Sequence, residues 1–234
     1  MNPRRAPFHL VGTGPGDPDL LTLAARRLLE RVDAVWAVAA AGTRPRALDV
    51  VRPHLRPDLP VRVFELGMRA GEGEKADFYA ALAEEAERVS GLGEEVALLC
   101  LGDPLFYGTA ARVLRFLDPD IPVRIHPGVN AVALACARLA VPLALGEEVV
   151  VVTPATLPDA RLRALLEVAD VLVVLKVGGH LRRLKALLAE YGRLESAWLA
   201  AELSGEGEAI WRLDADAPLT APYMSLVIAR RDAA

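Results

Sequence analysis

The chain has 234 residues, a net charge of −4 and 53% hydrophobic residues. This balance is typical of a globular protein with a sizeable core, and it excludes global disorder and low-complexity structure. The acidic balance argues against a general nucleic-acid binder, which needs a basic excess. No uncharged apolar run approaches the ~20 residues that cross a bilayer. We therefore expect a cytoplasmic protein with neither a nucleic-acid partner nor a membrane segment.

The cysteines and histidines indicate neither a disulfide scaffold nor a metal site. Cys100 and Cys136 each lie in an apolar run, which predicts buried free thiols and suits a reducing compartment. His9, His54 and His126 lack the spacing of metal ligands. The sequence therefore predicts no metal.

Short β-branched runs alternate along the chain with helical stretches rich in Leu and Ala, the pattern of an α/β fold. In the first half we expect strands at 8–11, 34–38, 61–66, 96–101 and 123–126, and helices at 20–31, 75–90 and 107–117. In the second half we expect strands at 149–153, 171–176, 197–203, 209–213 and 224–229, and helices at 161–168 and 181–191. This order predicts two α/β domains, 1–120 with a mostly parallel sheet and 121–234 with a mixed sheet.

The first glycine-rich loop, VGTGPGDPDLLT at Val11–Thr22, follows a strand and precedes a helix. A dinucleotide fingerprint needs glycine at position 17, which is Asp17, and Pro15 removes an amide donor. A phosphate-binding P-loop is excluded because the chain has no Gly-Lys-Ser/Thr. Two interpretations remain: a tight loop approached closely by a flat ligand, or a plain turn with Asp17 or Asp19 capping the helix.

Two further loops follow predicted strands of the same domain. LGDPLFYGT begins at Leu101, and Asp103 in it either accepts hydrogen bonds from a ligand or caps a helix. HPGVNAVALACA begins at His126, and Asn130 is a good cap for the next helix. Because the carboxyl ends of parallel strands share one edge of a sheet, we expect the three loops to cluster there.

Together, GTGPGDPDLLT, LGDPLFYGT and HPGVNAVALACARLAVPLA resemble the tetrapyrrole methylases, S-adenosylmethionine-dependent enzymes of cobalamin and sirohaem synthesis. LKVGGHL at 175–181 and APYMSLVIA at 221–229 are similar to the subgroup that methylates precorrin-2 at carbon 20. The resemblance implies two α/β domains with the cofactor S-adenosyl-L-methionine in the cleft between them. It also implies a tetrapyrrole substrate and a homodimer.

The resemblance also implies roles for individual residues. Those expected at the cofactor are Leu101, Gly102, Asp103, Phe106, Asn130, Ala131, Val177 and Ser204. Those expected at the substrate are Gly14, Pro15, Asp17, Arg69 and Lys176. Arg69 and Lys176 are expected there because precorrin-2 carries eight carboxylates that need cations, and because each of these two residues follows a predicted strand and its loop. Further cations available for those carboxylates are Arg44, Arg46, Arg182 and Arg183.

The implied reaction is an in-line displacement on a sulfonium, which needs orientation and exclusion of water but no nucleophilic side chain. Candidates for a base that later removes a proton from the methylated carbon are Asp17, Tyr107 and His180. Two departures from the family stand out: WAVAAAG replaces a Tyr-Pro pair, and Leu203 replaces an arginine. Alternatives are a cobalt-containing substrate, another methylase substrate, or a module that senses S-adenosylmethionine without chemistry.

Overall fold

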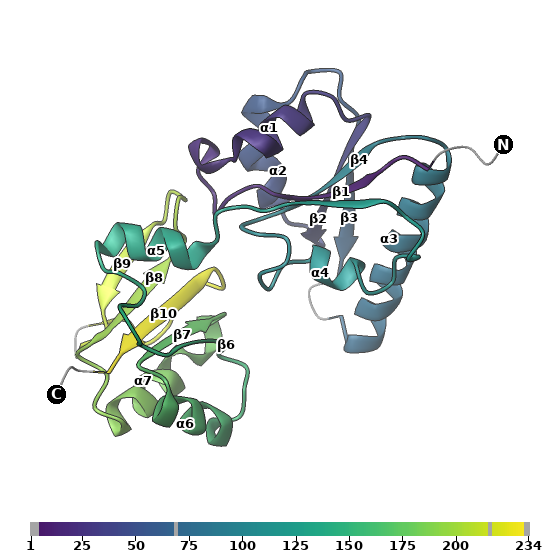
Figure 1. Cartoon of the computed structure of the whole chain (residues 1–234). Helices are drawn as coiled ribbons and strands as arrows, with labels where there is room; N and C mark the ends of the chain where they lie inside the picture. Colours follow the sequence, from purple (N-terminus) through teal and green to yellow (C-terminus); the bar gives the residue numbers. More distant parts are fainter. Residues whose placement is uncertain (1–4, 68–69, 215–216, 232–234) are drawn as a thin grey trace. The chain divides into compact units, whose positions relative to one another are not determined.

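The computed structural model describes residues 5–67, 70–214 and 217–231 (Figure 1). The chain divides into two compact units, Met1–Asn130 and Ala131–Ala234. Each unit contains one five-stranded sheet. The two α/β domains, one with a parallel sheet and one with a mixed sheet, are confirmed.

The sheet of the first unit is parallel throughout, in the order β3-β2-β4-β1-β5. The strands are β1 (Phe8–Gly12), β2 (Ala34–Ala40), β3 (Val61–Leu66), β4 (Val96–Cys100) and β5 (Val123–His126). Every residue of β1 and β4 is buried. These buried runs, apolar apart from His9, are what a parallel sheet covered on both faces requires.

Helices cover both faces of this sheet (Figure 1). The α-helices are α1 (Leu23–Leu29), α2 (Arg46–Val51), α3 (Glu72–Gly91) and α4 (Ala110–Val113). Residues of α1 and α2 share one hydrophobic cluster with the sheet, and residues of α3 and α4 share another. The first unit therefore has three layers, with the sheet in the middle.

Local capping explains where these helices begin. Asp17 accepts a hydrogen bond from the amide of Asp19 (2.9 Å) and caps a short 3-10 helix at Pro18–Leu20. Thr22 then caps α1 through its hydroxyl, which accepts from the amide of Ala25 (3.2 Å). The first loop thus contains the turn that its sequence allowed, with Asp17 as the cap.

Two predictions about helices were wrong. The helix expected at 107–117 is reduced to α4, because Tyr107 adopts a left-handed backbone (φ 57°) that no right-handed helix accommodates. The helix α2 was not predicted, although Ala47, Leu48, Val50 and Val51 on it are all buried. Its single turn and a half is too short to show a periodic pattern.

The second unit has a mixed sheet in the order β6-β7-β10-β8-β9, with a parallel pair at one end and antiparallel pairs elsewhere. Its strands are β6 (Val150–Pro154), β7 (Val171–Leu175), β8 (Ala197–Ala201), β9 (Ala209–Arg212) and β10 (Ser225–Arg230). Its α-helices are α5 (Ala131–Leu139), α6 (Asp159–Val168) and α7 (Leu181–Glu190). Leucines of α6 and α7 form one hydrophobic cluster with the sheet.

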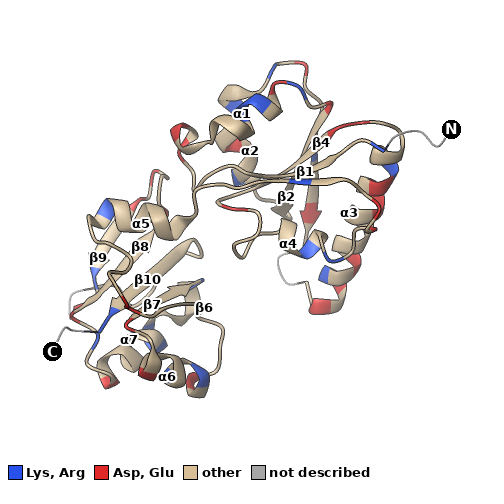
Figure 2. Cartoon of the chain, viewed as in Figure 1, with Lys and Arg blue, Asp and Glu red and all other residues tan. Residues whose placement is uncertain are grey.

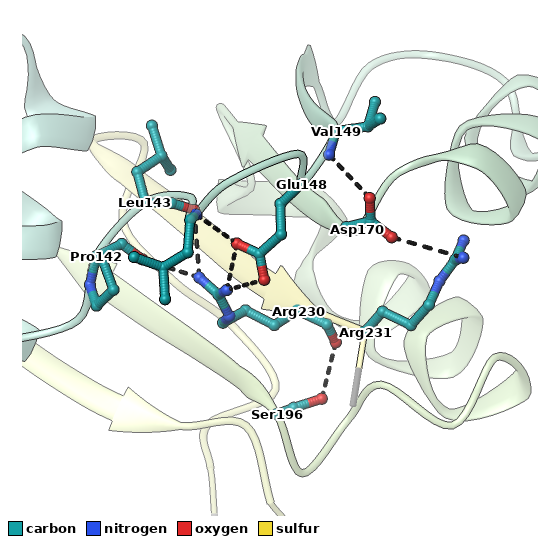
Figure 3. A network of polar contacts seen from close by, with 9 residues as sticks. Pro142, Leu143, Glu148, Val149, Asp170, Ser196, Arg230 and Arg231 are labelled. Carbon is teal, nitrogen blue, oxygen red and sulfur yellow. Dashed lines mark hydrogen bonds and ion pairs between the residues drawn. The ribbon is translucent and has the colours of Figure 1, made fainter. Parts of the chain in front are cut away.

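A polar network anchors the connection that leads into this sheet (Figure 3). The guanidinium of Arg230, at the end of β10, donates to both carboxylate oxygens of Glu148 (2.6 and 2.7 Å) and to the carbonyls of Pro142 and Leu143. Arg230 thereby lowers the pKa of Glu148. Nη2 binds both oxygens of the carboxylate and Nη1 binds the two carbonyls, so the guanidinium fixes the path of residues 142–148.

The first compact unit extends to Asn130 and includes β5, which pairs with β1. Charged residues are absent from β1 and β4 and abundant on α3 (Figure 2). Within the described residues no helix is long and apolar enough to span a membrane. Cys100 and Cys136 are free thiols; the first is buried and the second half-buried.

Candidate functional site

Three loops meet at the carboxyl edge of the first sheet, one after each of β1, β4 and β5. The strand order places β1 between β4 and β5, so the loops are neighbours. The connection that follows β1 runs through α1 on one face, and the connection that follows β4 runs through α4 on the other. Ligands of open α/β sheets bind where connections leave to opposite faces. This edge is therefore the candidate site.

The loops touch through glycine backbones. A Cβ built on Gly12 would lie 2.6 Å from the nitrogen of Gly128 and 2.7 Å from the carbonyl oxygen of Gly102. A Cβ on Gly128 would lie 2.2 Å from that same carbonyl oxygen. Such distances admit no side chain, so Gly12 and Gly128 are required by the close approach of three backbones. This contact between Gly12 and Gly128 was not predicted from the sequence.

Hydrogen bonds between the first two loops hold this arrangement. Gly14 and Gly102 exchange backbone hydrogen bonds (3.3 and 2.7 Å) and form an isolated antiparallel bridge. Both have a left-handed backbone, with φ values of 79° and 74°. Below them, the amide and hydroxyl of the buried Thr13 both donate to the carbonyl of Cys100 (2.9 and 3.2 Å). The two loops therefore form one rigid corner.

Asp103 joins the second loop to the third. Its Oδ1 accepts hydrogen bonds from the amides of Leu105 (2.9 Å) and Phe106 (3.1 Å), and its Oδ2 accepts from the amide of Gly128 (3.0 Å). The capping role considered for this residue is present, and the bond to Gly128 adds a tie between loops. A carboxylate has about four lone-pair sites, and these three bonds leave one of them, on Oδ2, for a further donor.

The aromatic pair after Asp103 is shaped by the next glycine. Phe106 and Tyr107 lie edge to face, with ring centroids 5.5 Å apart, and Tyr107 is 46% exposed. A Cβ on Gly108 would lie 2.7 Å from the carbonyl oxygen of Pro104. This tight turn holds Phe106 half-buried beside Asp103, where the cofactor contact was predicted.

The expected substrate residues of the first unit divide into two groups. Gly14 and Pro15 are buried in the corner, and Asp17 is half-buried as a helix cap. Arg69 lies outside the described residues. Among the other cations, Arg44 is exposed on the loop that follows β2. The carboxyl edge therefore brings the corner residues together, and the role of each toward substrate stays a prediction.

A buried histidine pair lies directly before the third loop and was missed as a functional feature. His9 on β1 is fully buried, and its Nδ1 lies 3.0 Å from Nε2 of His126 at the end of β5. Nε2 of His9 lies 3.5 Å from Oε2 of Glu95, which also binds Arg31. Burial, followed by His126, lowers the pKa of His9 to about 4. The signal in the sequence was a histidine inside the otherwise apolar strand FHLVG.

This histidine makes stability sensitive to acid. The pKa of His9 is about 4 in the folded chain, whereas an unperturbed histidine, as in the unfolded chain, has a pKa of 6.5. Between pH 4 and pH 6.5 the unfolded chain therefore binds more protons than the folded chain. The free energy of unfolding is therefore expected to be highest above pH 6.5 and to fall as the pH approaches 4. Urea denaturation across this range measures it. His9→Leu should show a shallower dependence on pH, and an identical dependence in the variant would contradict the assignment.

The second unit has its own edge, where β7 and β8 end and β10 begins. Lys176 after β7 has a left-handed backbone (φ 58°). Val177 is fully buried, with its side chain in the hydrophobic core of this unit, and the cofactor contact expected for it stays a prediction. A Cβ on Gly178 would lie 3.3 Å from the Cα of Tyr223. This close approach brings the motif LKVGGHL against the motif APYMSLVIA. His180 is half-buried at the start of α7.

The loop after β8 at this edge contains the buried hydroxyl of Ser204. Glu202 and Ser204 both have a left-handed backbone, with φ values of 47° and 63°. The amide of Ser204 donates to Glu208 (2.6 Å), which also binds Arg138. Oγ of Ser204 is buried and has no hydrogen-bond partner among the described residues. Strained backbone and an unsatisfied polar atom are frequent at ligand sites, which supports the role predicted for Ser204.

The remaining expected residues are placed as follows. Leu101 packs partly against the α1 face of the first sheet, and Gly102 is buried. Asn130 is half-buried at the end of the first unit, and Ala131 is the first residue of α5. Arg183 is not a free cation, because it donates to the carbonyls of Ala155 and Leu157 and pairs with Asp159. No cluster of His, Cys, Asp and Glu able to hold a metal occurs in the described part of the chain.

A parallel sheet with glycine-cornered loops at its carboxyl edge, followed by a mixed-sheet unit, defines a two-unit α/β protein of the kind that binds small molecules at a sheet edge. The sequence profile of the Tetrapyrrole (Corrin/Porphyrin) Methylases matches residues 7–218. The chain belongs to this family, and it is an S-adenosylmethionine-dependent methyltransferase. The resemblance of the three loops is thereby confirmed.

Relatives with established names cover nearly the whole chain. It is 34% identical to the cobalt-precorrin-2 C(20)-methyltransferase of Salmonella typhimurium, with 96% of each chain covered. It is 35% identical to the precorrin-2 C(20)-methyltransferase of a Sinorhizobium species, covering 93% of this chain and 92% of that one. Among solved structures, uroporphyrin III C-methyl transferase from Thermus thermophilus aligns with a TM-score of 0.70, 26% identity and coverage of 96% and 97%.

Proposed function

We propose that this chain transfers the methyl group of S-adenosyl-L-methionine to carbon 20 of precorrin-2, giving precorrin-3A and S-adenosylhomocysteine in cobalamin biosynthesis. The observation that carries this proposal is the similarity, over more than nine-tenths of the chain, to two relatives named for methylation at that carbon. The motifs LKVGGHL and APYMSLVIA, which meet at Gly178 and Tyr223, support the same subgroup.

The reaction breaks the bond between sulfur and methyl and forms a carbon–carbon bond at the electron-rich meso carbon, which afterwards loses its proton. The protein's contribution is to orient the two reactants and to exclude water. Rigid backbone at the carboxyl edge of the first sheet, fixed by Gly12, Gly102 and Gly128, suits that task. Asp17, Tyr107 and His180 stay the candidates for the base, and Asp103, Phe106 and Ser204 stay those for contacts to the cofactor.

A second candidate keeps the reaction and changes the substrate to cobalt-precorrin-2. The observation that favours it is the relative from Salmonella, whose identity of 34% is almost the same as the 35% of the relative named for the metal-free substrate. We further propose that the protein works as a homodimer in the cytoplasm, which the family resemblance and the free thiols Cys100 and Cys136 support. Analytical ultracentrifugation tests the dimer.

Mass spectrometry of the products tests the function. Purified protein is incubated with S-adenosylmethionine and either precorrin-2 or its cobalt form, and we expect one added methyl group on one of them, at carbon 20 by NMR. Protein without the methyl donor is the control. Methylation at another carbon would contradict the assignment of carbon 20 as the position that is methylated. Tight binding of the donor with no methylation of either compound would favour the sensing module instead.

A further inference from the structure

The pair His9–His126 is an unusual feature for the interior of a parallel sheet. His9 is completely buried, with an exposed fraction of 0%, so neither water nor a ligand reaches it. Its neighbours on β1 are apolar. A buried imidazole costs free energy unless its nitrogens have partners. An aliphatic residue would fill the same place without that cost. The partners of His9 therefore indicate what the histidine is for.

The carboxylate of Glu95 determines which nitrogen of His9 holds the proton. Nε2 of His9 faces Oε2 of Glu95 at 3.5 Å, and a lone pair on that nitrogen would point at a negative charge. The proton therefore belongs on Nε2. Nδ1 of His9 is then an acceptor, and Nε2 of His126, 3.0 Å away, must donate to it. The hydrogen bond therefore runs from His126 to His9. Nε2 of His9 faces the carboxylate of Glu95 in a charge contact and makes no hydrogen bond within the described residues.

The charged groups around the pair are consistent with two neutral rings. Burial is the largest cause that lowers the pKa of His126, and the positive charges of Arg31 and Arg124 lower it further. Burial, His126 and Arg31 oppose protonation of His9, and Glu95 only partly offsets them. Near neutral pH one proton therefore lies between the two rings. Two protonated rings would repel each other and break the contact.

The strand that carries His126 needs a side-chain tether. Among the described strands, β5 pairs with β1 alone and has only four residues, so backbone pairing holds it weakly. Its last residue is His126, and Gly128 follows two residues later. The amide of Gly128 binds Asp103, and its Cα lies against Gly12 and Gly102. A shift at the end of β5 therefore moves the third loop against the other two.

We propose that Glu95, His9 and His126 form a positioning device that holds the end of β5, and with it Gly128, in the place where the three loops of the candidate site meet. The three are positioning residues, because they act through Gly128 and Asp103. The inference rests on the proposed function only for the identity of the ligand, S-adenosylmethionine or its product. The hydrogen bond between the two histidines, the charge contact with Glu95 and their effect on Gly128 do not depend on that identity.

Matched variants of His126 test the device. Gln has an amide nitrogen that reaches nearly as far as Nε2 of the imidazole, so His126→Gln keeps the donor, whereas His126→Leu removes it. Titration calorimetry with S-adenosylhomocysteine should show about five- to tenfold weaker binding for His126→Leu, the effect of one buried hydrogen bond. His126→Gln should recover most of the affinity. His54→Gln, a histidine outside the site, should bind like the wild type.

Two further measurements do not need the ligand. Nitrogen-15 NMR of the wild-type imidazoles should show the proton of His9 on Nε2 and that of His126 on Nε2. The amide of Gly128 should exchange its hydrogen faster in His126→Leu than in the wild type. A proton on Nδ1 of His9, or unchanged exchange at Gly128, would overturn the inference.

The outcomes separate this inference from the proposed function. If the wild type fails to bind S-adenosylhomocysteine, the function is wrong, and the exchange and NMR results still decide the inference. If the wild type binds and His126→Leu binds equally well, the inference is wrong and the function stands. If His126→Leu does not fold, the NMR result on the wild type and the affinity of His126→Gln decide.

Discussion

Replacing Gly128 by alanine is expected to lower the free energy of unfolding by more than about 3 kcal/mol, because it places a methyl group into packed backbone. The new Cβ would lie 2.2 Å from the carbonyl oxygen of Gly102 and 2.9 Å from the Cα of Gly12. Neither neighbour is the end of a flexible side chain, so whole loops have to move. Variant protein that still folds should lose measurable binding of S-adenosylhomocysteine. Urea denaturation and titration calorimetry measure the two effects.

Gly73→Ala is the matched control for this substitution. Gly73 lies exposed in the first turn of α3, and nothing lies within 4 Å of a Cβ built there. Alanine in a helix is favoured over glycine by up to about 1 kcal/mol, so the control should be neutral or stabilising. A Gly128→Ala variant as stable as Gly73→Ala would show that the three loops do not approach each other as closely as described.

Asp103→Ala is expected to destabilise the chain by about 2–3 kcal/mol and to weaken donor binding at least about tenfold, since it leaves charge-assisted hydrogen bonds unmade. The amides of Leu105, Phe106 and Gly128 lose their common acceptor. The first two amides can turn to water at this half-buried position. The amide of Gly128 loses the tie between the second and third loops, so the loss of affinity should exceed what local unfolding alone causes.

Asp118→Ala separates the tie between loops from an ordinary local cap. Asp118 also accepts a hydrogen bond from an amide two residues later, that of Asp120 (2.8 Å), and pairs with the exposed Arg5. Removing the side chain of Asp118 should lower the free energy of unfolding by about 1 kcal/mol or less and leave the binding of S-adenosylhomocysteine unchanged. Equal stability and equal affinity of Asp103→Ala and Asp118→Ala would remove Asp103 from the candidate site.

Most elements of the fold could be predicted because their patterns are local. The run of β4 is apolar throughout and that of β1 is apolar apart from His9, and α3 has a long pattern bounded by Gly71 and Gly93. The prediction failed where local signals were weak. The helix α2 is too short for periodicity, and the backbone of Tyr107 depends on a turn that Gly108 closes against Pro104.

The candidate site divides in the same way. The sequence by itself determined the family, the three glycine loops and the carboxylate of Asp103, because residues that bend the chain or cap a helix act on their immediate neighbours. Only the tertiary structure decided that Gly12, Gly102 and Gly128 touch, that Val177 turns its side chain into a core, and that His9 meets His126. These contacts join residues far apart in the chain, and strand order and register, which no local pattern encodes, bring them together.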